Sequence, residues 1–244
     1  MHKFITLNAL NDTQKNQYKD AINKAFPTII SQSPVILNNW SKLEAYFPEY
    51  QFFLISDNDD VIGFMNTVPF QFDQPHNQLP DRGWDWMFRK GINGYEYSVK
   101  ANHLGGLQVI VRSSFQSLGF SKVILDHAKS ILSTSNFKNL IIPIRPTKKH
   151  NFPTMTMSEY LNFKDNDKIY DPWIRTHLKS GAQIIKICEN SMIMIGNIKF
   201  WEKMLNKKIH KSGSYTLSGA LQLINIDIEN DRGEYIEPNI WIKY

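Results

Sequence analysis

The sequence predicts an α/β protein in which helices pack on a sheet that contains parallel strands. Residues 107–111 form an apolar run that breaks into a short polar loop, and residues 121–133 follow with apolar positions at helical spacing. This order is that of a strand, a tight loop and a helix. Residues 139–144 are almost wholly apolar, as in a strand inside a parallel or mixed sheet.

The residues before this central strand predict the first elements of the fold. Asn11 and Asp12 suit the cap of a helix that ends before Pro27, and a second amphipathic stretch covers residues 40–47. The Asn- and Asp-rich residues 57–60 favour a hairpin turn. The remaining expectations here are a strand at 4–7, strands at 51–56 and 61–68, and an inserted region at 69–101 that contains a helix.

The second half is expected to alternate helices and strands. Asp171 suits an N-cap, Pro172 the first helical position and Gly181 the C-terminal stop, so residues 171–181 predict a clear helix. The other expectations are a short helix at 158–163, strands at 183–188 and 192–195, a helix at 200–205, and strand-like runs at 221–228 and 235–241.

Composition is typical of a globular protein and excludes several functions. The 244 residues carry a formal net charge of +5, and 42% of them are hydrophobic. The basic residues are spread along the chain, so no nucleic-acid partner is expected. The apolar runs are too short for a bilayer, so no membrane partner is expected. The single cysteine, Cys188, excludes an intrachain disulfide and a cysteine-cluster metal site, and no metal is expected. The first residues lack the features of a secretory leader, which favours a cytoplasmic protein.

The polar loop carries the motif Gln116-x-x-Gly119-x-Ser121. A helix N-terminus has unpaired N–H groups and a partial positive charge, which suit a phosphate, and a glycine lets a ligand approach the backbone closely. The motif resembles the pyrophosphate loop of the GNAT superfamily of N-acetyltransferases, whose pattern is Q/R-x-x-G-x-G/A. Ser121 departs from the last position of that pattern, but serine is small and can donate its hydroxyl.

The resemblance covers roughly residues 80–241. The order of elements is that of the GNAT fold, and strings at 83–86, 144–148, 171–175, 213–215 and 237–241 look like a branch of large bacterial GNAT-like proteins without a defined substrate. The resemblance implies a mixed, mostly antiparallel sheet with splayed central strands, flanked by helices. It also implies a core at residues 1–198 and an extension at 199–244 on the same domain. That extension equally suits an added strand, a cover for the acceptor pocket or a homodimer contact.

The resemblance also implies the cofactor, acetyl-CoA or another acyl-CoA. Backbone groups of the central strand would bind the pantetheine arm, and loop amides would bind the pyrophosphate. The cofactor-binding residues implied are Gln108, Val109, Ile110, Val111, Gln116, Ser117, Leu118, Gly119, Phe120 and Ser121.

Catalysis of acyl transfer needs a neutral amine, a stabilised oxyanion and a protonated leaving thiolate. The family usually places a tyrosine for the last task four residues before a glycine, on the helix after the fifth strand. Here that position is His177, which can donate a proton near neutral pH. The alternative is a helix-face histidine that the helix dipole stabilises. Asn102 and His103 are candidates for the base, and Tyr160 is a further candidate acid.

Two regions are candidates for the acceptor site. Asp85 lies between Trp84 and Trp86, where it would bind a cation beside an aromatic wall, although packing of both tryptophans onto the core is the favoured alternative. Arg145 follows the fifth strand, and ligands of open α/β sheets gather at the carboxyl ends of strands. It would clamp a carboxylate or phosphate, or else form a salt bridge with Asp171 or Glu237.

The sequence therefore predicts an acyl-CoA-dependent N-acyltransferase that acts on a primary amine of a small molecule in a ternary complex. One alternative is a protein of the same fold that binds CoA or an acyl carrier with altered or lost transfer. The other is a protein N-acetyltransferase, which the insertion disfavours because it would narrow the acceptor side.

Overall fold

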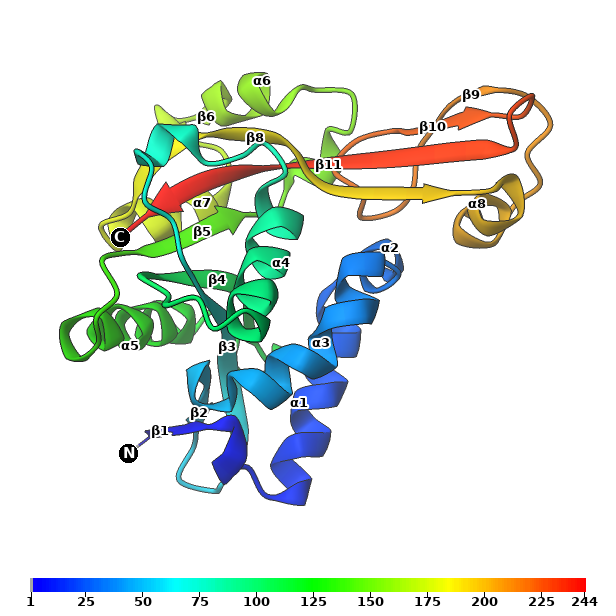
Figure 1. Cartoon of the computed structure of the whole chain (residues 1–244). Coiled ribbons are helices and arrows are strands. Elements are labelled where there is room, and N and C mark those ends of the chain that lie inside the picture. Colours follow the sequence, from blue (N-terminus) through cyan, green and yellow to red (C-terminus); the bar gives the residue numbers. More distant parts are fainter. Residues whose placement is uncertain (1) are drawn as a thin grey trace.

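A computed structural model describes residues 2–244, and its centre is a nine-stranded sheet (Figure 1). The strand order is β1-β2-β3-β4-β5-β11-β10-β9, and β8 pairs with the other edge of β11. The strands are β1 (Lys3–Thr6), β2 (Gln51–Ile55), β3 (Val61–Phe70), β4 (His103–Val111), β5 (Leu140–Ile144), β8 (Gln183–Gly196), β9 (Gly213–Tyr215), β10 (Ile224–Asp227) and β11 (Arg232–Lys243). A separate ribbon joins β6 (Lys164–Asp165) and β7 (Lys168–Ile169).

Helices cover this sheet and begin largely where their capping residues predict. They are α1 (Asp12–Ala25), α2 (Thr28–Ser31), α3 (Pro34–Tyr46), α4 (Gly83–Glu96), α5 (Phe120–Thr134), α6 (Met157–Asn162), α7 (Pro172–Lys179) and α8 (Ile198–Leu205). Asn11 and Gln14 form a capping box at α1, and the Asp171 carboxylate accepts the Trp173 and Ile174 N–H groups at α7. Among residues 2–244, no helix is long and apolar enough to cross a membrane.

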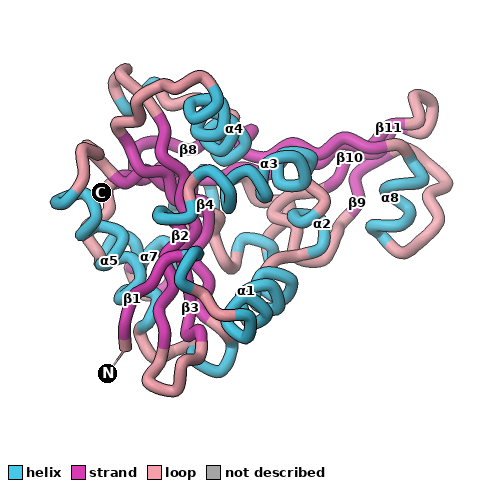
Figure 2. The backbone as a smooth tube through the Cα atoms, turned by 60° about the horizontal axis from the view of Figure 1, so that its bottom comes forward, coloured by secondary structure: helices cyan, strands magenta, loops and turns pink. Residues whose placement is uncertain are grey.

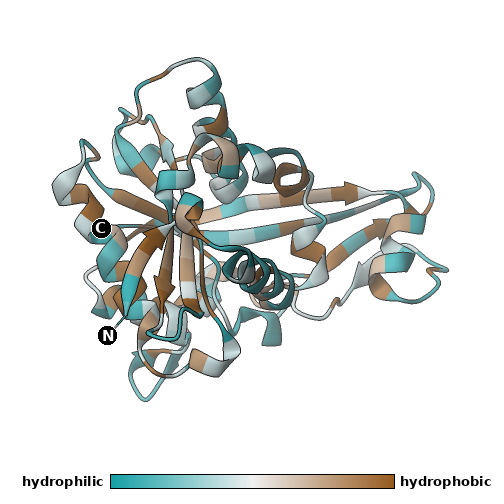
Figure 3. Cartoon of the chain, turned by 90° about the horizontal axis from the view of Figure 1, so that it is seen from below, coloured by the Kyte–Doolittle hydropathy of each residue, from teal (hydrophilic) through white to brown (hydrophobic). Residues whose placement is uncertain are grey.

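Buried side chains form separate clusters around the sheet. One cluster includes residues of α3, α4 and β8, a second lies among α5, α6 and α7, and a third lies under α1. Figure 3 shows hydrophobic segments concentrated on the central strands. Burial of these apolar faces is the main favourable term that fixes helices to the sheet.

The central strands are splayed, as the resemblance implied. Within the nine-stranded sheet, β4 and β5 form the parallel pair, and their register covers Leu104–Leu140 and Gly105–Ile141 alone. Beyond these residues β5 continues beside β11, with Ile144 opposite Ile240. The other strand pairs of the sheet are antiparallel, so the mixed, mostly antiparallel architecture is confirmed.

Some element boundaries differ from those that the sequence predicted. Residues 183–196 form one strand, β8, instead of two, because a register shift in its pairing with β11, between Cys188 and Met192, absorbs the irregular residues between the two apolar runs. Helix α3 begins at Pro34, six residues before the predicted start, and α2 precedes it. β11 lies between β5 and β8, so residues 232–243 are part of the central sheet.

The ends of β8 and β11 extend away from the body as a long arm that also carries α8, β9 and β10 (Figures 1 and 2). A Cβ atom built on Gly219, in the loop between β9 and β10, would lie 2.4 Å from Cγ of Pro27. The base of the arm therefore touches the turn between α1 and α2.

Candidate active site

A single cavity of about 1270 Å³ joins the splayed strands to the arm. Its walls come from β4, β5, the loop before α5, the α1–α3 segment and β11. Typical small-ligand pockets hold roughly 300–1,000 Å³. The volume is thus large enough for two ligands to bind together.

The loop before α5 has a backbone geometry that suits an anion. Ser117 and Gly119 have positive φ values of 63° and 82°, and within residues 2–244 no side chain caps the N-terminus of α5. A Cβ on Gly119 would meet no atom within 4 Å, so the space beside this backbone is open. The uncapped N–H groups and the helix dipole suit a pyrophosphate, and the residues present fit the expected cofactor.

Most of the expected cofactor-binding residues line the cavity. They are Gln108, Val109, Ile110, Val111, Gln116, Ser117, Gly119, Phe120 and Ser121. Gln116 Nε2 donates to the Val111 carbonyl at 3.0 Å, which fixes the loop on the end of β4. Leu118 does not line the cavity, and its side chain is 65% exposed.

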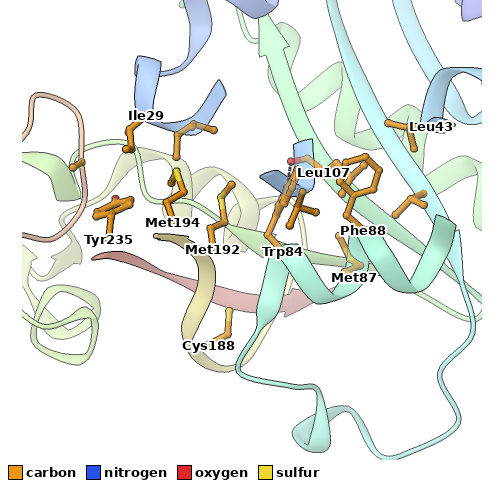
Figure 4. Close-up of a cluster of buried hydrophobic side chains, with 14 of the residues drawn as sticks. Ile29, Leu43, Trp84, Met87, Phe88, Leu107, Cys188, Met192, Met194 and Tyr235 are labelled. Atoms are coloured by element: carbon orange, nitrogen blue, oxygen red, sulfur yellow. Dashed lines mark hydrogen bonds between the residues drawn. The ribbon is translucent and has the colours of Figure 1, made fainter. Parts of the chain in front are cut away.

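A β-bulge shapes the middle of β4. Asn66 pairs with Gln108 and Thr67 with Gly106, so Leu107 is the extra residue. The indole Nε1 of Trp84 donates to the Leu107 carbonyl at 2.8 Å, as Figure 4 shows. A bulge leaves backbone groups without partners in the strand ladder. The Trp84 side chain of α4 bonds one of these groups, and this contact fixes the backbone where β4 and β5 separate.

A charged cluster lies at the end of the cavity that β5 and β11 form. Arg145 donates through Nε (2.9 Å) and Nη2 (3.1 Å) to the carboxylate of Glu237, and Nη2 also donates to the Gly219 carbonyl at 2.6 Å. The Tyr235 hydroxyl donates to Glu237 at 2.6 Å. Of the two partners that the sequence offered, Arg145 therefore pairs with Glu237. Its Nη1 atom makes no hydrogen bond within residues 2–244.

A polar group and an apolar wall lie beside this pair. Asn239 Oδ1 accepts the Ser191 hydroxyl at 2.6 Å, and Ser191 in turn accepts the Trp84 backbone N–H. Met192 and Trp84 also line the cavity, and Figure 4 shows them in the apolar cluster near Leu107. This end of the cavity is thus apolar on one side and charged on the other.

His177 is buried and lines the same cavity. Its Nδ1 lies 2.7 Å from the hydroxyl of Tyr244, whereas its Nε2 has no hydrogen-bond partner among residues 2–244. Burial lowers the pKa of His177 to about 3, so the ring is neutral at physiological pH. Its role as a proton donor in the imidazolium form therefore has no support from the geometry.

Asn102 and His103 lie outside the cavity, because β4 begins four residues before the bulge and at the opposite end from the phosphate loop. His103 Nδ1 lies 2.7 Å from Asn102 Oδ1, and its Nε2 lies 3.1 Å from Nε2 of His76. Burial lowers the pKa of His103 to about 4. The structure does not bring these residues to the cavity.

Tyr160, Asp85 and Trp86 also lie outside the cavity lining. The Tyr160 hydroxyl donates to Asp171 at 2.9 Å and thereby supports the cap of α7. Trp86 packs edge-on against Phe70 and other aromatic rings, as the packing alternative predicted. Asp85 is buried, its Oδ2 accepts the Ile193 N–H, and its Oδ1 has no partner within residues 2–244.

Sequence reasoning missed several wall residues, including Asn239 and Met192. They belong to β8 and β11, which meet the cavity only because β11 is inserted next to β5. The sequence predicted a strand at 235–241, but it did not indicate which strands lie beside it.

Comparisons with known proteins agree with this geometry. No family model matches the chain. The arginine N-acetyltransferase avaD of Aspergillus versicolor is 28% identical over 249 residues, which cover 91% of this chain and 85% of that protein. This relative is fungal, so it gives no support to the expectation of a bacterial protein.

Two solved structures share the fold. The loading GNATL domain of CurA from Lyngbya majuscula has a TM-score of 0.59 at 13% identity, with 100% of this chain and 97% of that chain covered. The GphF GNAT-like decarboxylase in complex with isobutyryl-CoA has a TM-score of 0.58 at 10% identity, with 99% and 98% covered. These likenesses confirm the fold that the sequence predicted.

Proposed function

We propose that this chain, a member of the GNAT superfamily, transfers an acyl group from an acyl-CoA, with acetyl-CoA the expected donor, to a primary amine of a small molecule. The observation that carries the proposal is the single cavity that runs from the uncapped α5 N-terminus, past the β4 bulge, to the Arg145–Glu237 pair. Both substrates fit into it together, so the amine attacks the acyl group directly.

The residues of the chain then have separate tasks. Loop amides from Ser117 to Ser121 hold the pyrophosphate, and the backbone of Gln108 to Val111 holds the pantetheine arm. Acyl-CoA supplies the activated acyl group. The backbone at the Leu107 bulge, which Trp84 fixes, stabilises negative charge on the carbonyl oxygen.

The acceptor is expected to carry a carboxylate as well as an amine. Nη1 of Arg145 is free to bind it, because Glu237 and the Gly219 carbonyl already hold the other side of the guanidinium. The likeness to an arginine N-acetyltransferase supports arginine or a related amino acid as the first candidate.

A steady-state assay of CoA release tests this proposal with acetyl-CoA and a panel of amines. Arginine and agmatine form the matched pair, because agmatine lacks only the carboxylate. We expect arginine to have a kcat/KM at least about tenfold above that of agmatine, since the Arg145 contact is lost. A lysine-containing peptide in the panel tests for protein acetylation. Binding of acetyl-CoA without transfer to any amine would contradict the proposal and favour a protein that only binds the cofactor.

A further inference from the structure

The side chain of Gln108 offers an unpaired oxygen to the cavity. Gln108 lies directly after the bulge of β4, lines the cavity and is half-buried. Its Nε2 donates to Asn66 Oδ1 at 2.7 Å, whereas its Oε1 accepts no hydrogen bond within residues 2–244. The fully enclosed polar side-chain atoms without a partner in residues 2–244 belong to Ser33, Asp85, His177 and Trp201. The Gln108 oxygen is not among them, so a ligand in the cavity can reach it.

A chain of side-chain amides fixes which atom of Gln108 faces the cavity. Gln51 Nε2 donates to the backbone carbonyls of Phe47 (2.8 Å) and Thr67 (2.9 Å), which can only accept, so Gln51 Oε1 must point the other way. That oxygen accepts Asn66 Nδ2 at 2.9 Å, and Asn66 Oδ1 accepts Gln108 Nε2. Gln51 and Asn66 are fully buried, so reversing this order of donors and acceptors would leave buried polar atoms unpaired. Gln108 therefore presents its carbonyl oxygen as the free acceptor.

Gln108 and Arg145 face the same layer of helices. The side chain of Gln108 lies on the same face of β4 as that of Ile110, which packs in the cluster under α1. Arg145 shares its carboxylate partner with Tyr235, which packs in the cluster that includes residues of α3 and α4. Phe26 at the end of α1 packs against both clusters, so the two faces are continuous. The oxygen of Gln108 and the Nη1 atom of Arg145 thus lie on one face of the sheet, in the same cavity.

We propose that Gln108 Oε1 accepts a hydrogen bond from the nitrogen of the acceptor amine and holds that nitrogen against the acyl carbon. The inference rests on the proposed function. It gives a task to the side chain, whereas the backbone of the same residue binds the pantetheine arm. Of the two groups that react beside the bulge, the acyl thioester has no N–H or O–H to donate, and the amine has. Because the hydrogen bond uses an N–H, the nitrogen lone pair is left to attack the acyl carbon.

The amide supports this attack without exchanging a proton. The C–N bond forms, the C–S bond breaks and its electron pair moves to sulfur, while the nitrogen becomes positive. The oxygen end of the Gln108 amide dipole stabilises that charge. The proton that the nitrogen then loses passes to water and the leaving thiolate takes one from water, so Gln108 is unchanged.

Calorimetry at pH 8 on the CoA-saturated protein tests the contact without turnover, with arginine or the panel amine that the wild type acetylates in its place. The matched pair is Gln108→Met and Gln108→Glu, since both lose the donor to Asn66 and only the glutamate keeps an oxygen. We expect the Kd for the amine to rise about tenfold in Gln108→Met and to stay at or below the wild-type value in Gln108→Glu. Gln183→Met, the same change at an exposed glutamine outside the cavity lining, is expected to bind as the wild type does. Equal weakening in Gln108→Met and Gln108→Glu would overturn the inference, because the lost link to Asn66 would then explain it.

The steady-state assay separates this inference from the proposed function. With the amine that the wild type acetylates, we expect Gln108→Met to lower kcat/KM at least about tenfold while its Kd for acetyl-CoA stays unchanged. A wild-type kcat/KM in Gln108→Met, or a raised Kd for acetyl-CoA, would overturn the role at the amine and leave the proposed function standing. A wild type that binds acetyl-CoA but transfers its acyl group to no amine would overturn the proposed function, and this inference would fall with it.

Discussion

Asp85 shows how a buried charge can be misread from a sequence. Its place between two tryptophans suggested a cation site, but the structure buries it against β8 with Oδ1 unpaired. Burial raises its pKa to about 6. At neutral pH the folded protein therefore holds an ionised carboxylate that lacks a direct partner for one oxygen.

We expect Asp85→Asn to stabilise the protein above pH 6 and to change little near pH 4. A carboxyl whose folded pKa is raised contributes stability that is fully present below its unfolded pKa, near 3.8, and is lost as the pH rises through about 6. The gain at pH 8 is on the order of 1–3 kcal/mol, because each pKa unit corresponds to about 1.4 kcal/mol. An asparagine oxygen still accepts the Ile193 N–H.

Urea unfolding of both proteins at several pH values measures this difference. The buried His103 and His177 have lowered pKa values and lose stability as the pH falls, but they do so equally in both proteins, so their contribution cancels. If the difference in unfolding free energy between wild type and variant does not change with pH, the raised pKa of Asp85 is contradicted.

At the scale of elements, local sequence signals predicted helices and turns. They did not predict which strands pair when those strands are far apart in the sequence. The caps at Asn11 and Asp171 and the Gln116–Gly119 motif placed α1, α7 and the turn before α5 correctly, because these signals act within one turn. The insertion of β11 beside β5 depends on contacts about a hundred residues apart. That pairing brings Glu237 and Asn239 to the cavity.

The bulge of β4 leads to a testable prediction at the scale of elements. Trp84→Phe keeps most of the apolar surface but leaves the buried Leu107 carbonyl without its indole donor. We expect a loss of about 1–2 kcal/mol in the free energy of unfolding. We also expect a lower kcat with an unchanged Kd for acetyl-CoA, since the bulge would hold the reacting carbonyl less firmly. Trp86→Phe is the control, because Trp86 lies outside the cavity lining. Equal kinetic effects in the two variants would argue against a role for the bulge.

At the scale of the whole molecule, the arm completes the site. Gly219 lines the cavity, adopts a positive φ of 77° and lies against Pro27 in the turn between α1 and α2. Figure 2 shows α2 beside the strands of the arm. Contact between two parts of the chain that are far apart in sequence thus forms part of the cavity wall.

We expect Gly219→Ala to raise the KM for the amine several-fold while the Kd for acetyl-CoA is unchanged. The added Cβ would clash with the Pro27 ring and push the arm away from the turn. Gly213→Ala is the matched control, because Gly213 also has a positive φ but its Cβ would meet open space. The same change in amine KM in both variants would show that backbone strain in the arm, not the contact with Pro27, is responsible.

The central claim is that the loop before α5 binds the pyrophosphate of an acyl-CoA, and calorimetry of acetyl-CoA binding tests it most directly. The variants are Gly119→Trp, which fills the open space at the loop, and Gly181→Trp, which also replaces a glycine of positive φ in open surroundings but lies outside the cavity lining. We predict a Kd in the micromolar range for the wild type and Gly181→Trp and no measurable binding for Gly119→Trp. Absence of binding by the wild type, or equal binding by Gly119→Trp, would contradict the account.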